Sequence, residues 1–183
     1  SWDSSSAAQD ANEIDLSETS DHLVDSLPLG NINVVYKETS AWAMTFVGPP
    51  FIFRFYQILF HRGLLHRDCV TKWPGGHCVA TQDDIIVHTG QIRSDQSIID
   101  DKVRSWLFQA IDPDNFYNSF MFTHNAKNEV WFCFPEVGQT YASLALIWDW
   151  KRNNIGFRDL VPTPFAAVGP IGDSFVTDFV WGD

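Results

Sequence analysis

The stretch Asn128–Leu160 constrains the fold of this chain more than any other segment. It contains three apolar, aromatic-rich runs, at Val130–Phe134, Ser143–Trp150 and Ile155–Leu160. The polar residues 151–154 form a reversal between the second and third runs. Short runs rich in aromatic and β-branched residues, separated by turn chemistry, are typical of paired strands. The stretch therefore predicts a three-stranded antiparallel meander.

Strand signals of the same kind occur through most of the chain. Short apolar runs alternate with turn residues such as Gly48-Pro49-Pro50 and Pro74-Gly75-Gly76. The expected strands cover residues 32–37, 41–47, 51–60, 69–73, 77–81, 85–88, 118–123 and 174–181. The sequence therefore predicts a mainly all-β fold.

One amphipathic segment interrupts the strands. Five apolar side chains recur at the spacing that places them on one helical stripe: Ile99, Val103, Trp106, Leu107 and Ala110. The pattern predicts a single inserted helix at about residues 98–111, with Ser97 as its N-cap. A lone helix in a β chain is expected to cover the edge or the face of a sheet.

A weak internal repeat indicates how the strands are organised. An apolar pair leads to an amphipathic residue and a reversal at Tyr36, His88 and Trp148, which are 52 and 60 residues apart. Propeller repeats are about 40 to 50 residues long, so these intervals fit blades that carry insertions. We therefore expect irregular, β-propeller-like blades of antiparallel meanders, and a β-sandwich is the alternative.

Composition divides the chain into three parts. Residues 1–28 contain seven carboxylates and no Lys or Arg, which predicts an acidic, Ser/Asp-rich extended arm or linker. This arm is expected to be either a solvated tether or a segment that packs on a neighbouring subunit. Residues 29–165 form the expected propeller-like body, and residues 166–183 form the start of a further strand unit.

The net charge and the cysteines argue against several protein classes. The net charge is −11, whereas proteins that grip nucleic acid need a basic surface. This charge suits ordinary solubility, and it also suits a wall past which DNA slides without adsorbing. Cys69, Cys78 and Cys133 are odd in number and lack CxxC spacing, so buried, reduced thiols are expected in place of a disulfide framework or a zinc site. No apolar run approaches the length of a membrane span.

Few residues of the chain fit the patterns of catalytic or ligand-binding sites. His61 and His66 have no cysteine or carboxylate at metal-ligand spacing. The pairs Asp83-Asp84 and Asp100-Asp101 are explained by a turn and by the first turn of the helix. Nothing selects either pair as the two carboxylates of a glycosidase. The sequence therefore predicts no catalytic residue, no metal site and no cofactor.

Exposed aromatic residues are the remaining candidates for contact with a partner or a sugar. The candidates for such a contact are Trp2, Trp73 and Trp181. Trp73 is the best candidate surface contact because it lies beside the Pro-Gly-Gly turn. Packing in the core is the alternative for each of them.

Four segments occur in an order shared with a known family. They are LGNINVVYKETSAWAMTFVGPPFIFRF (29–55), RDCVTKWPGGHCVATQDDIIVHTG (67–90), DDKVRSWLFQAID (100–112) and NEVWFCFPEVG…LALIWDWKRNNIGFRDL (128–160). In this ordered set, the chain resembles the tail tubular protein B, or tail nozzle, family of short-tailed, podovirus-like bacteriophages. The resemblance covers about residues 25–165. It departs from the family at Ile155, where a Trp is usual.

The resemblance implies a virion structural protein of the viral tail that is not an enzyme. A homohexameric ring would form a nozzle below the tail adaptor protein, with tail fibres or spikes attached nearby. Phage DNA would pass through the lumen at genome ejection without specific binding. Family members are several times longer and this chain begins with Ser, so we expect a fragment.

Two other functions remain open from the sequence. One is a receptor- or glycan-binding β-propeller module at the tail tip. The other is a hydrolase, which would need a convergent carboxylate pair that the sequence does not reveal.

Overall fold

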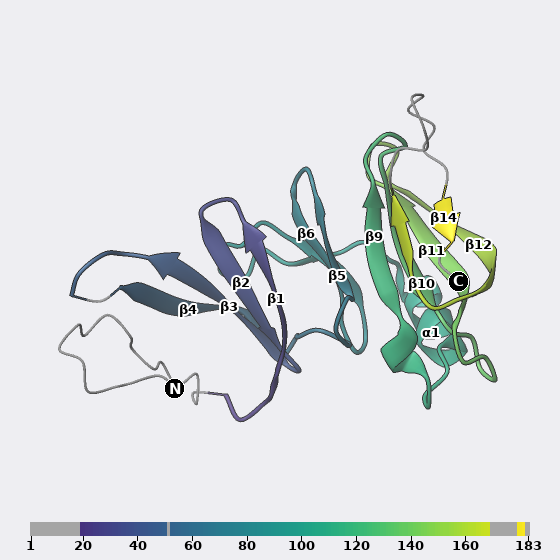
Figure 1. Ribbon diagram of the computed structural model, residues 1–183, viewed down its shortest axis with the longest axis horizontal. Helices are drawn as coiled ribbons and strands as arrows, with labels where there is room; N and C mark the ends of the chain where they lie inside the picture. The colour runs from purple at the N-terminus through teal and green to yellow at the C-terminus, as the bar shows by residue number, and fades with distance from the viewer. Residues whose placement is uncertain (1–18, 51, 169–178, 182–183) are drawn as a thin grey trace.

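The computed structural model describes residues 19–50, 52–168 and 179–181. Over these residues the chain is mainly β-structure, as the sequence predicts (Figure 1). It forms three four-stranded antiparallel sheets, a two-stranded sheet, an α-helix and a short 3₁₀-helix. Each four-stranded sheet takes its strands in chain order, so each is a meander. None of the described sheets closes into a barrel.

The first sheet begins earlier than the sequence pattern indicates. Its strands are β1 (Leu23–Leu29), β2 (Ile32–Lys37), β3 (Ser40–Phe46) and β4 (Phe53–Phe60). The expected arm of residues 1–28 therefore overlaps β1, and its residues 1–18 lie outside the described part of the chain. β1 is missed because Asp25, Ser26 and Pro28 interrupt its apolar pattern. Proline is tolerated there because β1 is an edge strand.

Residues just before β1 are tied to the first sheet. Asp21 Oδ1 lies 2.9 Å from Lys37 Nζ, and both side chains are less than a tenth exposed. Asp21 Oδ2 accepts hydrogen bonds from Thr39 N, Thr39 Oγ1 and Ser40 Oγ. Burial opposes the charged carboxylate, but hydrogen bonds from Thr19, Lys37 and Thr39 outweigh it and hold the pKa of Asp21 well below its usual range. The described end of the expected arm thus packs on its own chain.

The second sheet is smaller and carries the predicted hairpin. Its strands are β5 (Val70–Trp73), β6 (Gly76–Ala80), β7 (Ile85–His88) and β8 (Gln96–Ser97). β6 is the inner strand between β5 and β7, and it is buried along its whole length. Gly76 has a φ of 144°, and a Cβ there would lie 2.0 Å from the backbone oxygen of His88. Glycine is therefore required where the hairpin enters β6.

The helix α1 (Asp101–Ala110) confirms the predicted helix, but it begins later. Its N-cap is Asp100, whose side chain accepts a 2.8 Å hydrogen bond from Val103 N. The prediction of Ser97 as N-cap is wrong: the Ser97 hydroxyl donates to Asp84 Oδ1 at 2.7 Å. A carboxylate at the cap also interacts favourably with the helix dipole, which a serine does not.

The third sheet confirms the predicted meander. Its strands are β9 (Phe120–His124), β10 (Glu129–Phe134), β11 (Ala142–Asp149) and β12 (Asn154–Thr163), and the 3₁₀-helix η1 (Phe116–Asn118) precedes them. β12 continues past the predicted end at Leu160. After it, β13 (Ala166–Val168) pairs with β14 (Phe179–Trp181) in the two-stranded sheet. This small sheet lies in the part of the chain predicted to start a further strand unit.

The three large sheets follow one another across the molecule, and their first strands meet (Figure 1). β1 contacts β5, and β5 contacts β9. Asp68, just before β5, links both junctions. Its N–H donates to Asp25 Oδ2 at 3.3 Å, and its carbonyl accepts from Met121 N at 2.8 Å. The edge strands β1, β5 and β9 therefore lie side by side.

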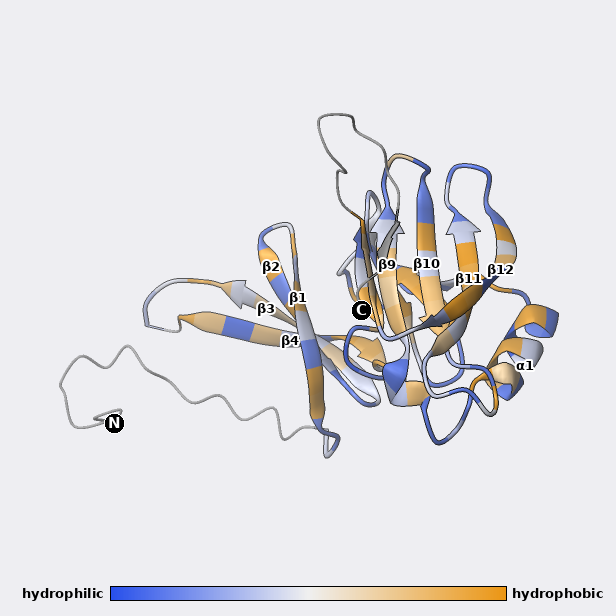
Figure 2. Cartoon of the chain, turned by 45° about the vertical axis from the view of Figure 1, so that its right-hand side comes forward, coloured by the Kyte–Doolittle hydropathy of each residue, from blue (hydrophilic) through white to orange (hydrophobic). Residues whose placement is uncertain are grey.

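Two apolar clusters hold the sheets together. The larger one joins Val34 of the first sheet, Val79 of the second and Phe132 of the third, and it includes Leu107 of α1. The smaller cluster lies on the opposite face of the third sheet, around Phe122, Trp131 and Cys133. Figure 2 shows this apolar character along β9, β10 and β11. The inner strands β10 and β11 are therefore buried on both faces, which explains their unbroken apolar runs.

Candidate functional site

A buried chain of polar side chains joins the first two sheets. Tyr36 comes from β2, His77 from β6 and His88 from β7, and none of them is more than about 1% exposed. Tyr36 Oη lies 2.8 Å from His77 Nδ1 and 2.7 Å from His88 Nε2. One hydroxyl therefore connects two imidazoles that belong to another sheet.

The backbone at each end fixes the direction of these hydrogen bonds. Gly90 N donates to His88 Nδ1 at 3.1 Å, so a neutral His88 carries its proton on Nε2 and donates to Tyr36 Oη. Tyr36 then donates to His77 Nδ1, which leaves the His77 proton on Nε2. His77 Nε2 lies 3.3 Å from the carbonyl oxygen of Pro28 and donates to it. Every donor in the chain thus meets an acceptor.

Burial keeps this chain neutral. It lowers the pKa of His77 to about 4, and burial together with His77 lowers the pKa of His88 to about 3. Burial also raises the pKa of Tyr36 well above its usual value. Both imidazoles are therefore uncharged near pH 7, and each ring nitrogen already has a hydrogen-bond partner. The arrangement links sheets, and it offers no unengaged acid or base.

Trp73, the predicted surface contact, lies at the end of β5 with its ring half buried. The centroid of this ring is 5.1 Å from that of Trp148 and 6.4 Å from that of Trp150. A Cβ on Gly75 would lie 2.3 Å from the indole, so the turn closes tightly over the ring. The Trp73 ring therefore packs within the molecule, between β5 and β11. Its contact with an outside partner stays a prediction. The side chains of Trp2 and Trp181 lie outside the described residues.

The paired carboxylates have structural partners. Asp84 is buried between two arginines, with Oδ2 3.5 Å from Arg62 Nη1 and Oδ1 3.3 Å from Arg104 Nε. Asp100 caps α1, and Asp101 pairs with Arg104. Arg104 pairs with both Asp84 and Asp101, so one guanidinium joins the two carboxylate pairs. None of these four residues lines either of the two described cavities.

The structure also shows what surrounds His66 and the three cysteines, for which the sequence predicts no metal role. The ring of His66 packs edge-on against Phe116 and Tyr117, with centroids 6.0 and 6.2 Å away. Over the described ranges, no three His, Cys, Asp or Glu side chains are grouped so that they could hold a metal ion. The three cysteines are buried as free thiols, and burial raises the pKa of each.

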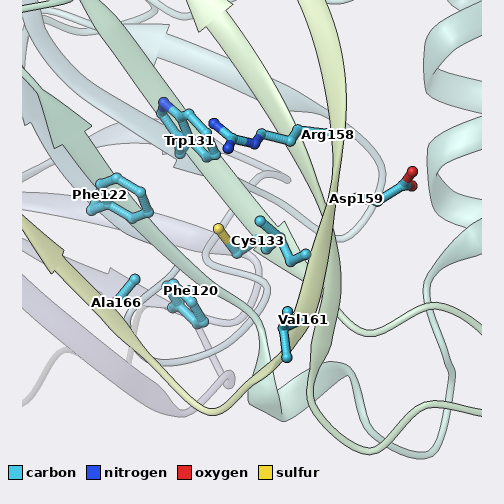
Figure 3. Close-up of a pocket in the computed structure, with 9 residues that line it drawn as sticks. Phe120, Phe122, Trp131, Cys133, Arg158, Asp159, Val161 and Ala166 are labelled. Atoms are coloured by element: carbon cyan, nitrogen blue, oxygen red, sulfur yellow. The ribbon is translucent and has the colours of Figure 1, made fainter. Parts of the chain in front are cut away.

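A cavity of about 160 Å³ lies on the outer face of the third sheet (Figure 3). Phe120, Phe122 and Trp131 contribute aromatic rings, and Arg158 places its guanidinium 5.6 Å from the Trp131 ring centroid. Asp159 is directed away from the cavity, as alternation along β12 requires. The cavity is therefore mainly apolar with one cationic group. No sequence pattern predicts this cavity, although alternation along residues 154–160 places Arg158 and Asp159 on opposite faces of the strand.

Comparisons with known proteins do not assign a family. No family model matches the chain, and a search of curated proteins found no significant similarity. Among the described residues, no helix is long and apolar enough to cross a membrane.

Proposed function

We propose that this chain is a structural subunit of a short bacteriophage tail, contributing to a ring-shaped nozzle for genome ejection. The observation that carries the proposal is the agreement between the family-like segments and the sheets. Segment 29–55 covers β2 and β3, segment 67–90 covers β5 to β7, and segment 128–160 covers β10, β11 and most of β12. The segments behind the resemblance thus coincide with successive meanders.

The arrangement of the meanders supports a propeller-like body. Blades of a β-propeller are four-stranded antiparallel sheets set around a common centre. Here three such sheets follow in chain order, and their first strands β1, β5 and β9 are neighbours. We propose that these strands form the inner side of the body and that the three meanders are its blades.

The charge of the chain supports passage of DNA without adsorption. A net charge of −11 repels phosphate at low and moderate salt. In this proposal the protein resides in the virion tail, where it contacts copies of itself, the adaptor protein and the tail fibres or spikes. No enzymatic step is part of the proposal. A basic wall around the lumen of the assembled ring would contradict the role given to the charge.

Native mass spectrometry and negative-stain electron microscopy of the purified chain test the proposal. A closed ring of defined copy number, six if the family pattern holds, is the expected result. Antibodies raised against the chain should also label the tail of the virion that carries it. A stable monomer that leaves the tail unlabelled would overturn the proposal.

The second candidate is a receptor- or glycan-binding module at the tail tip. The cavity beside Trp131 and Arg158 favours it, because ligand sites combine aromatic walls with a few polar groups. A glycan array tests it directly. Binding that is lost in Arg158→Ala, by a chain that stays monomeric, would favour this candidate over the nozzle.

A further inference from the structure

The hairpin formed by β3 and β4 ends in an exposed apolar tip. Phe46, Val47 and Phe53 are 67%, 48% and 42% exposed. The Phe46 and Phe53 rings meet edge-on with centroids 6.0 Å apart. β2 does not reach this tip, because Ile32 at its start pairs with Thr45. In both views the hairpin projects from one end of the molecule (Figures 1 and 2).

The tip is cationic on an otherwise acidic molecule. Arg54 follows Phe53 and is exposed, and no described carboxylate lies within ion-pair distance of it. Residues 39–67 contain no Asp or Glu, whereas the whole chain has a net charge of −11. The surface that complements this tip is therefore apolar and acidic.

A surface of that kind lies at the opposite end of the molecule, where α1 meets β12 (Figure 2). Trp106 and Phe157 are 45% and 43% exposed, and their ring centroids are 4.7 Å apart. Asp159 is exposed and two residues beyond Phe157, so the two side chains share a face of β12. Figure 3 shows the Asp159 carboxylate directed away from the cavity on the other face. We refer to Trp106, Phe157 and Asp159 as the acidic aromatic patch.

We propose that the β3–β4 tip of one copy docks on the acidic aromatic patch of the next copy. Phe46 and Phe53 pack against Trp106 and Phe157, and Arg54 faces Asp159. Buried aromatic residues and arginine are the usual anchors of protein interfaces. The two surfaces differ and lie at opposite ends, so the contact is head-to-tail, and repeating it generates a ring or a filament. This inference rests on the proposed ring and names the contact that builds it.

Sedimentation of the 183-residue chain over a range of concentrations tests the contact. F46S/F53S, R54E and D159R should each weaken self-association by about tenfold or more. The double variant R54E/D159R exchanges the charges and should restore most of the association. V137S is the matched control: Val137 is 65% exposed outside both surfaces, so association should stay at the wild-type level. Far-UV circular dichroism confirms that each variant is folded.

The possible results separate this inference from the proposed function. If the wild type forms a ring and the tip variants form the same ring, the docking contact is wrong and the nozzle proposal stands. If the wild type stays monomeric at every concentration, the docking contact is overturned, and the nozzle proposal falls with it when antibodies also leave the tail unlabelled. Failure of R54E/D159R to recover association would refute the Arg54–Asp159 pairing. A wild type that does not self-associate but floats with phosphatidylglycerol vesicles, when F46S/F53S does not float, would show that the tip binds a lipid surface in place of a second copy.

Discussion

Tyr36 Oη bridges His77 Nδ1 and His88 Nε2, so one hydroxyl of β2 satisfies two imidazoles of the second sheet. The Gly90 N–H at one end and the Pro28 carbonyl at the other leave a single arrangement of protons for the neutral chain. A buried network of this kind is costly to break, because each loss leaves another polar atom without a partner. The junction of the first two sheets therefore depends on specific hydrogen bonds as well as on apolar packing.

Replacing Tyr36 by Phe removes the bridge and keeps the ring. His77 Nδ1 and His88 Nε2 then lose their partner inside the core, so we expect the free energy of unfolding to fall by about 2–3 kcal/mol. Urea unfolding followed by circular dichroism measures this change. Tyr141→Phe is the control, because Tyr141 is 45% exposed, and its effect should stay within about 0.5 kcal/mol. Equal stability of the two variants would contradict the bridging role.

The two neutral histidines predict that acid destabilises the fold. In the folded state the pKa values of His77 and His88 are about 4 and 3, whereas an unfolded histidine has a pKa near 6.5. Between these values the unfolded chain binds more protons, so stability falls as the pH drops below about 6.5 and rises again as the pH increases. Each histidine contributes at most about 1.4 kcal/mol per pH unit in this window.

Urea unfolding at several values between about pH 4.5 and pH 7 measures this slope. In His77→Asn, the amide oxygen can still accept from Tyr36 but does not titrate, so the slope should become shallower. His22→Asn is the control, since His22 lies before β1 and outside the Tyr36 chain. A slope that is unchanged in His77→Asn would assign the pH dependence to other groups.

The sequence predicts the third sheet well and misses two edge strands, β1 and β8. β10 and β11 are recognisable because both faces of these two inner strands are buried, which gives unbroken aromatic and aliphatic runs. β1 and the two-residue strand β8 are edge strands, and their exposed positions carry polar residues or proline. Their pairing partners, and not their own composition, make them strands.

The polar contacts of the core are not predictable from local pattern. His77 and His88 are 41 and 52 residues from Tyr36, and no spacing rule connects them.

The apparent repeat of Tyr36, His88 and Trp148 does not mark equivalent places, because β2 is the second strand of its sheet while β7 and β11 are third strands. The sequence does allow the helix cap at Asp100 to be predicted, since aspartate is a preferred N-cap residue whose side chain accepts from the N–H three residues later.

Asp84 is predicted to hold α1 and the loop before β5 to the second sheet. Its carboxylate is 2% exposed and pairs with Arg62 and Arg104, each about a third exposed. Asp84→Asn keeps the shape but leaves two guanidinium groups without their shared anion. Because both arginines are partly solvated, we expect a loss of about 1–2 kcal/mol in the free energy of unfolding.

Asp68→Asn is the control for Asp84. Asp68 has a side chain that is 70% exposed and 3.9 Å from Arg67, so its charge should matter little. Its φ is 66°, a conformation that asparagine also adopts readily. Chemical unfolding of both variants at low salt gives the comparison. A loss for Asp68→Asn as large as that for Asp84→Asn would show that burial does not strengthen the Asp84 pairs.

Truncating Trp73 distinguishes a core role of its side chain from a surface role. Its indole packs against Trp148 and Trp150 and lies under Gly75. Trp73→Ala should therefore lower the free energy of unfolding by about 2–3 kcal/mol, less than for a fully buried ring. Tyr141→Ala, which truncates a half-exposed ring, should cost under about 1 kcal/mol. If Trp73→Ala leaves thermal unfolding unchanged but weakens self-association or glycan binding, the ring acts as a surface contact, because only an outside partner then accounts for its effect.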